Sequence, residues 1–179
     1  MEIQKMLPTM LQAAKLILKK RPDTNFTMPR AKTIPLKMLE DMVKAAGVPV
    51  KIIEGDNYDV MFSADLALAT SGTVTLEAAL CGLGSVIVYK TSPITAFIAR
   101  RVIPNIGLPN IVAGKRILPE LLQEEFTPER LQQEALALLE PERNTQMKKD
   151  LAYVSERLGE PGAVHRVAEL VLRIAEEKQ

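Results

Sequence analysis

The stretch that decides the fold is residues 66–89, which read LALATSGTVTLEAALCGLGSVIVY. Its two short apolar runs, 66–69 and 86–89, show no alternation of apolar and polar residues. Such runs are typical of strands buried on both faces of a parallel sheet that helices cover. Residues 73–81 between them are predicted to form a helix that ends at Gly82. The pattern indicates an α/β protein with a doubly wound, mostly parallel, Rossmann-like sheet.

The flanking sequence continues the alternation of helices and strands. Apolar residues recur at helical spacing from Ile3 to Leu18, and Pro22 restricts the residue before it, so this helix should end near Arg21. Further strands are expected at 25–28 and 48–53, with helices at 35–47, 58–63 and 94–102 and two or three more within 129–178. We therefore predict one Rossmann-like domain over residues 1–140 and a C-terminal helical tail over residues 141–179.

Composition narrows the classes of function. The 179 residues carry 23 Lys+Arg and 22 Asp+Glu, so the chain lacks the basic excess that nucleic-acid binding normally requires. One cysteine excludes an internal disulfide, and one histidine with one cysteine argues against a His/Cys metal site. Cys81 is expected to be a small core residue, and His165 has no partner pattern that would mark a catalytic base.

The sequence shows no segment that is expected to cross a membrane. Charged residues interrupt the apolar N-terminal twenty residues, and the other apolar runs are strand-sized. A soluble protein is therefore expected, although an amphipathic helix would still allow peripheral membrane contact.

Chemistry is expected where the strand at 66–69 runs into the helix at 73–81. Ligands of open α/β sheets bind at the carboxyl ends of strands, and a helix start offers free backbone N–H groups to a phosphate. Gly72 would let the backbone approach a ligand, while Ser71, Thr73 and Thr75 would add hydroxyl groups. Glu77, one turn into the helix, could accept hydrogen bonds from sugar hydroxyls.

An alternative reading of the same residues is ordinary helix capping. Ser or Thr before a helix commonly caps it, and a first-turn glutamate complements the helix dipole. The spacing also fits neither a Walker A loop nor a GxGxxG fingerprint, and GxSxG and HExxH are absent from the sequence. The motif alone therefore leaves both a phosphate site and a plain cap open.

Three segments in order carry a resemblance to a known family. They are SGTVTLEAALCGLGSVIVYK at 71–90, SPITAFIARR at 92–101 and LPNIVAGKRILPELLQEEFTPERL at 108–131. Together they resemble the C-terminal half of lipid-A-disaccharide synthase, a glycosyltransferase built from two Rossmann-like domains (the GT-B fold). The resemblance covers nearly the whole chain. It implies that residues 1–140 bind a nucleotide-sugar, and it implies no cofactor and, since the chain has no acidic DxD motif, no metal.

The resemblance also implies roles for the residues of the motif. Ser71, Gly72 and Thr73 would face the diphosphate of a UDP-sugar donor, and Glu77 would hold the ribose hydroxyls. The reaction implied is transfer of 2,3-diacylglucosamine from UDP to 2,3-diacylglucosamine 1-phosphate, a step of lipid A biosynthesis.

Other residues receive roles from the resemblance with weaker support. Ile53 and Glu54, in a loop that runs to residue 56, would lie near the uracil. Asn110 would approach the donor sugar or the diphosphate, although an asparagine after a proline is equally often a turn residue. Gln123 and Glu124 are further candidates, and the alternative for both is a solvated helix face.

The chain also departs from the family pattern. It begins at the first helix, without the strand and Gly-Ser-Arg loop that precede it in the family and without the N-terminal acceptor domain, where catalytic groups are expected. Lys90 stands where the family usually has an arginine, which keeps the charge and loses the bidentate fork. We therefore expect a fragment, which is either a split or truncated gene whose partner half is another chain or a shortened gene model. The absent strand would have been central in the sheet.

Three functions remain open from the sequence. The first is the donor-binding half of the glycosyltransferase, cytoplasmic or peripheral on the inner membrane, working on a lipid acceptor. The second is a nucleotide-sugar-binding module that is inactive without a separate N-terminal chain. The third is a remnant that associates through its helices. The amphipathic C-terminal helices would also permit a homodimer.

Overall fold

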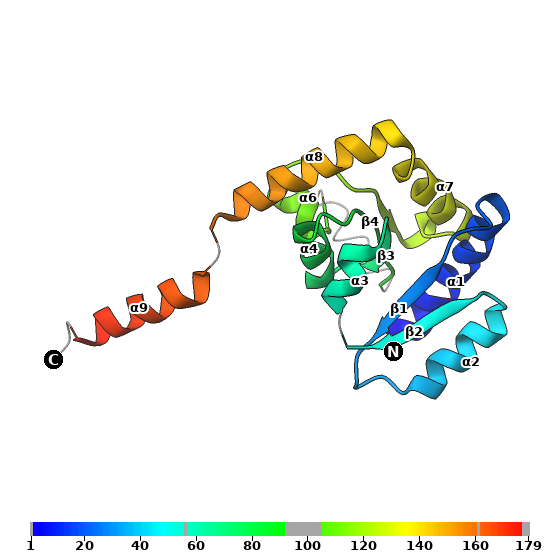
Figure 1. Cartoon of the computed structure of the whole chain (residues 1–179), viewed down its shortest axis with the longest axis horizontal. Helices are drawn as coiled ribbons and strands as arrows, with labels where there is room; N and C mark the ends of the chain where they lie inside the picture. Colours follow the sequence, from blue (N-terminus) through cyan, green and yellow to red (C-terminus); the bar gives the residue numbers. More distant parts are fainter. Residues whose placement is uncertain (1, 56, 92–104, 161, 177–179) are drawn as a thin grey trace.

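The computed structural model describes residues 2–55, 57–91, 105–160 and 162–176 (Figure 1). The helix expected at 94–102 lies outside these residues. Most of the described chain forms one body of strands and helices, and the last helix extends away from it (Figure 1).

The first helix, α1 (Glu2–Lys20), packs one apolar face into the core. Its buried residues recur at helical spacing and include Met6, Ala13 and Ile17. Two lysines in the last turn complement the helix dipole, and the helix ends just before Arg21 and Pro22, as predicted.

The next three elements form a small parallel unit. Strand β1 (Phe26–Arg30) pairs in parallel with β2 (Val50–Glu54), and α2 (Leu36–Ala46) connects them. Gly47 ends α2 at φ 65°, a left-handed conformation that glycine adopts at low cost. The predicted end of this helix is confirmed.

A second sheet carries the motif. Helix α3 (Asn57–Ser63) leads into β3 (Ala67–Thr70), α4 (Thr73–Leu80) and β4 (Ser85–Tyr89). After α6 (Leu108–Ala113), β5 (Glu120–Leu122) joins the sheet, whose order is β3-β4-β5 with all pairs parallel.

Strand β4 is the centre of the second sheet. Its residues Val86, Ile87 and Val88 are 0% exposed, and both α4 and α7 contact the strand. The apolar run was predicted to be buried on both faces, and the structure confirms it.

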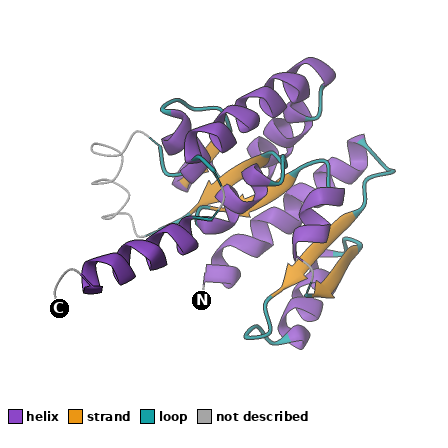
Figure 2. Ribbon diagram, turned by 60° about the vertical axis from the view of Figure 1, so that its left-hand side comes forward, coloured by secondary structure: helices purple, strands orange, loops and turns teal. Residues whose placement is uncertain are grey.

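The strands do not form one continuous sheet. The sequence analysis predicted a single doubly wound sheet, whereas the described strands form a two-stranded sheet β1-β2 and a three-stranded sheet β3-β4-β5 (Figure 2). The class, α/β with parallel strands, is confirmed. Among the described strands, β1 pairs only with β2, and β3 pairs only with β4.

Helices complete the body at the C-terminal end. A short 3-10 turn, η1 (Gln123–Glu125), precedes α7 (Pro128–Leu138), and the Thr127 side chain accepts a hydrogen bond from the Arg130 amide at 3.2 Å, which confirms the predicted cap. Helix α8 (Pro141–Leu158) packs on α4, α6 and α7, whereas α9 (Ala163–Glu176) projects into solvent (Figure 1). Among the described residues, no helix is both long and apolar enough to cross a bilayer.

Candidate functional site

The predicted site lies at the carboxyl ends of the strands of the second sheet. In the parallel register Thr70 pairs with Val88 and Tyr89 pairs with Leu122, so β3, β4 and β5 end at the same edge. The residues that follow these strands, Ser71 among them, are therefore gathered at that edge. This is where open α/β sheets bind their ligands.

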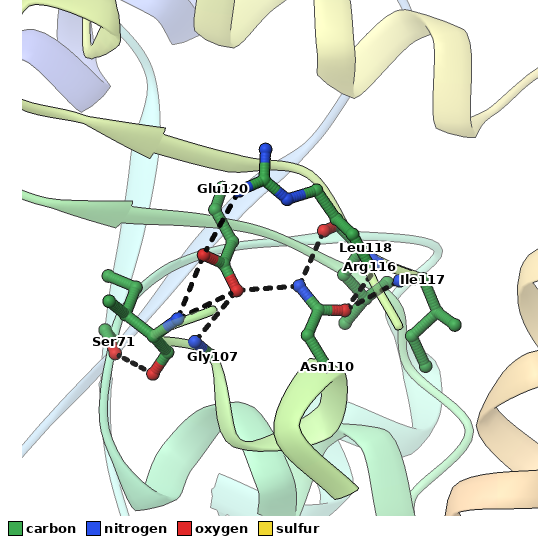
Figure 3. A network of polar contacts seen from close by, with 8 residues as sticks. Ser71, Gly107, Asn110, Arg116, Ile117, Leu118 and Glu120 are labelled. Carbon is green, nitrogen blue, oxygen red and sulfur yellow. Dashed lines mark hydrogen bonds and ion pairs between the residues drawn. The ribbon is translucent and has the colours of Figure 1, made fainter. Parts of the chain in front are cut away.

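Backbone and side-chain hydrogen bonds hold the loop between β3 and α4 in place. The Ser71 amide donates to the Val88 carbonyl at 3.0 Å, and the Ser71 hydroxyl donates to the Ile106 carbonyl at 2.9 Å (Figure 3). Gly72 is extended, and a Cβ atom built on it would meet nothing within 4 Å. The loop is thus held by the hydrogen bonds of Ser71 and is open at the Cα atom of Gly72.

The start of α4 has no side-chain cap. Its N-cap is Gly72, and the Thr75 hydroxyl and amide both point back to the Gly72 carbonyl, at 2.7 and 3.2 Å. Within the described residues, no hydrogen bond uses the amides of Thr73 and Val74, and both residues are exposed. The capping alternative is therefore wrong for this helix. Free amides at a helix start are suited to an anion such as a phosphate.

Glu77 lies one turn further along α4 and is half-buried. Its Oε2 atom accepts a weak hydrogen bond from the Tyr58 hydroxyl of α3 at 3.4 Å. The pKa of the nearby Cys81 thiol is raised by burial, and the negative charge of Glu77 raises it further. Glu77 is therefore accessible and ready to accept hydrogen bonds from a ligand.

Two predicted residues do not face this surface. Thr75 is 0% exposed, and its hydroxyl is used by the Gly72 carbonyl. Asn110 is also 0% exposed, and its amide is satisfied inside the protein. Its Nδ2 donates to the Leu118 carbonyl and to Glu120, both at 2.8 Å, and its Oδ1 accepts from the amides of Ile117 and Leu118, both at 2.8 Å. The sequence does not distinguish buried polar residues such as Thr75 and Asn110 from exposed ones, because buried and exposed polar residues occur at similar positions near loops.

Glu120 is the residue that sequence reasoning missed. Its side chain is fully buried and accepts hydrogen bonds from the amides of Ile106 (3.0 Å) and Gly107 (2.9 Å) and from Asn110 (Figure 3). The Arg116 guanidinium approaches the carboxylate at 3.9 Å. Glu120 thereby fixes the loop at Ile106, whose carbonyl accepts a hydrogen bond from the Ser71 hydroxyl. The available signal was a glutamate at the start of an otherwise apolar strand.

Gln123 lies at the same sheet edge and contacts the loop that follows β4. It adopts a left-handed backbone at φ 53°. When the side-chain amide is oriented so that its NH2 group and its oxygen both have partners, the NH2 group donates to the Thr91 carbonyl at 3.2 Å. The side-chain oxygen then accepts from the Thr91 backbone amide at 3.0 Å. Lys90, next to Thr91, is exposed and adds a cation at this edge. Glu124, the weaker candidate, is exposed as well.

Ile53 and Glu54 end the neighbouring sheet. Ile53 is half-buried, and Glu54 is exposed and forms an ion pair with Arg30 of β1. Helix α3 follows directly, and its Tyr58 reaches Glu77. The prediction that these two residues lie near the uracil stays a prediction.

Other features of the described residues do not compete with this site. No group of three or more His, Cys, Asp or Glu side chains in the described ranges could hold a metal ion. A groove between α2 and β2, lined by Leu36, Val43 and Ile52 among others, contains none of the predicted site residues.

Comparisons with known proteins agree with the resemblance. The family described as lipid-A-disaccharide synthetase matches residues 1–174. The lipid-A-disaccharide synthase of Trichlorobacter lovleyi is 40% identical over 98% of this chain and 47% of its own length. The enzymes of the same name from Syntrophus aciditrophicus and Geobacter sulfurreducens are each 38% identical over 97% of this chain and 46% of their own length.

These matches cover nearly all of the chain, whereas the chain spans about half the length of the curated relatives it matches. The family match over residues 1–174 shows that the chain belongs to the lipid-A-disaccharide synthetase family.

Proposed function

We propose that this chain is the nucleotide-sugar-binding half of a hexosyltransferase. The reaction is transfer of 2,3-diacylglucosamine from UDP to 2,3-diacylglucosamine 1-phosphate in lipid A biosynthesis. The observation that carries the proposal is the start of α4, where the amides of Thr73 and Val74 bond to no described residue. They lie beside a half-buried Glu77 in a member of this family. Amides of this kind donate hydrogen bonds to a diphosphate, and the carboxylate accepts hydrogen bonds from ribose hydroxyls.

The chain's share of the mechanism is electrostatic. Displacement at the anomeric carbon leaves negative charge on the departing diphosphate. Backbone donors that are already fixed in place stabilise that charge without rearranging during the reaction. Ser71 and Glu120 hold these donors in place. Ser71 connects the loop between β3 and α4 to the loop at Ile106 and Gly107, and Glu120 binds the amides of that second loop. Lys90 is placed to add a positive charge at the same edge.

We propose as a second function a nucleotide-sugar-binding module that turns over only together with an acceptor domain. The family match and the site at α4 support the binding part of this function equally well. Turnover with and without such a domain separates the two functions. Both place the chain in the cytoplasm or at the periphery of the inner membrane, with a lipid acceptor as the further partner.

Isothermal titration of the purified chain with UDP tests the donor site. Saturable binding of UDP that is weakened when the β-phosphate is removed, as in UMP, supports the site at α4. Equal binding of UMP and UDP would contradict the diphosphate assignment. A cooperative melt without any UDP binding would contradict the donor-binding function itself.

Glu77→Ala tests the ribose contact. Removing an acceptor of charge-assisted hydrogen bonds should weaken UDP binding by about 1–3 kcal/mol, or roughly 5- to 150-fold. Glu40→Ala on α2 is the matched control, because Glu40 is also a helical carboxylate, and it is exposed and lies in the other sheet's unit. Unchanged UDP affinity in a folded Glu77→Ala chain would refute the ribose assignment.

A further inference from the structure

A series of polar contacts connects the interior of the protein to the start of α4 (Figure 3). It begins at Asn110 and the Glu120 carboxylate, both of whose side chains lie in the interior at 0% exposure. It continues through the loop at Ile106 and ends at Ser71. Ser71 directly precedes Gly72, the N-cap of α4. Two side chains that are closed to a ligand are therefore connected to the loop that is assigned to the diphosphate.

The orientation of the Asn110 side chain is set by its partners. Its Oδ1 atom accepts from the backbone amides of Ile117 and Leu118, so its NH2 group must point the other way. There the NH2 group donates to the Glu120 Oε1 atom at 2.8 Å. A carboxylate only accepts hydrogen bonds, so an NH2 group is the kind of partner that Glu120 requires on this side. Asn110 thereby sets where the Glu120 carboxylate lies.

The Glu120 carboxylate in turn holds the loop that contains Ile106. Its Oε1 atom accepts from the Gly107 amide at 2.9 Å, and its Oε2 atom accepts from the Ile106 amide at 3.0 Å. Space at this point is also tight, because a Cβ atom on Gly107 would overlap the Ile87 side chain and lie 3.1 Å from Glu120. Bonds to a charged acceptor and close packing therefore act together on this loop.

The last contact uses the only hydrogen of the Ser71 hydroxyl, which donates to the Ile106 carbonyl at 2.9 Å. The Ser71 backbone amide is used as well, because it donates to the Val88 carbonyl at 3.0 Å. A phosphate at neutral pH carries oxygens that accept hydrogen bonds. While the bond to Ile106 is intact, Ser71 has no hydrogen to donate to such an oxygen.

We propose that Ser71, Asn110 and Glu120 are positioning residues of the donor site, which raise its affinity for the nucleotide without touching it. They hold the start of α4 in the position in which its first amides meet the diphosphate. A Cβ atom on Gly72 would meet nothing within 4 Å, so a loop released from Ser71 would gain backbone freedom that ligand binding must then remove. This proposal rests on the proposed function, which supplies the ligand.

A double-mutant cycle on UDP binding tests the proposal. Isothermal titration compares the parent chain, Ser71→Ala, Glu120→Gln and the double variant, each well below its melting temperature. Each single variant should bind UDP about 5- to 30-fold more weakly, which corresponds to ordering one backbone residue on binding. Because both residues act through the same loop, the double variant should lie within about twofold of the weaker single variant. Losses that multiply would show that the two residues act separately and would overturn the proposal.

Gly84→Ala controls for a loss of stability alone. Its Cβ would collide with Met147 before the first residue of β4, whereas the donor site lies at the other end of that strand. This variant should keep the parent's UDP affinity. Ser71→Ala and Glu120→Gln should instead lose more affinity for UDP than for UMP, which has fewer phosphate oxygens to meet the amides of α4. Equal losses for the two nucleotides would contradict an effect on the start of α4.

Gly107→Ala covers the case in which Glu120→Gln does not fold. It keeps every polar group and crowds Ile87 and Glu120, and its effect should also be non-additive with that of Ser71→Ala. If the parent chain binds UDP and both Glu120→Gln and Gly107→Ala keep its affinity, this proposal alone is overturned. A parent chain that melts cooperatively and binds no UDP would contradict the proposed function, and this proposal would fail with it.

Discussion

Replacing Glu120 with glutamine should destabilise the chain far more than an ordinary surface change. The carboxylate is fully buried and accepts from the amides of Ile106 and Gly107 and from Asn110, at 2.8 to 3.0 Å. A glutamine must place its NH2 group against at least one of these donors. It also removes the charge that strengthens the remaining bonds.

The magnitude follows from these contacts. A hydrogen bond to a charged group contributes about 1.5–3 kcal/mol, and a buried donor left without a partner costs about 1–3 kcal/mol. Loss of one or two bonds therefore predicts about 2–4 kcal/mol for Glu120→Gln. In a domain of this size each kcal/mol lowers Tm by about 2–4 °C, so Tm should fall by roughly 4–16 °C.

Urea unfolding followed by circular dichroism measures this free energy. The midpoint should fall while the slope stays the same, because the change removes contacts and leaves the buried area intact. Glu40→Gln on the exposed face of α2 is the control and should stay within about 0.5 kcal/mol of the parent. A loss below about 1 kcal/mol for Glu120→Gln would refute the view that this carboxylate holds the loop.

Three further predictions concern packing and titration. Gly84→Ala should cost about 1–3 kcal/mol in urea unfolding, because its Cβ would lie 2.0 Å from a buried methionine sulfur of α8. Burial opposes a lower pKa for Asp150, but hydrogen bonds from Lys115 and Gln146 lower it below the usual aspartate value. The stabilisation from this carboxylate should therefore be complete above about pH 5 and should be lost as the pH falls through the lowered pKa of the folded form. The difference in Tm between the parent chain and Asp150→Asn, measured at several pH values, tests this. Burial and the charge on Glu77 raise the pKa of Cys81, so Glu77→Ala should lower that pKa and speed alkylation by iodoacetamide at pH 8; an unchanged rate would contradict the electrostatic contact.

Local patterns were enough to predict most of the elements. The helical periodicity of α1, the glycine that ends α2 and the cap at Thr127 each depend on a few neighbouring residues, and all three are confirmed. Helix α6 and strand β5 were not predicted, because six and three residues are too short to show a period.

Long-range pairing is where the sequence was insufficient. Strands β1 and β2 look like members of the same sheet as β3, since nothing in their residues says which strands are neighbours. The roles of Asn110 and Glu120 were hidden for the same reason. Their partners are 7 to 14 residues away in the chain and become visible only when the loop at Ile106 folds onto β5.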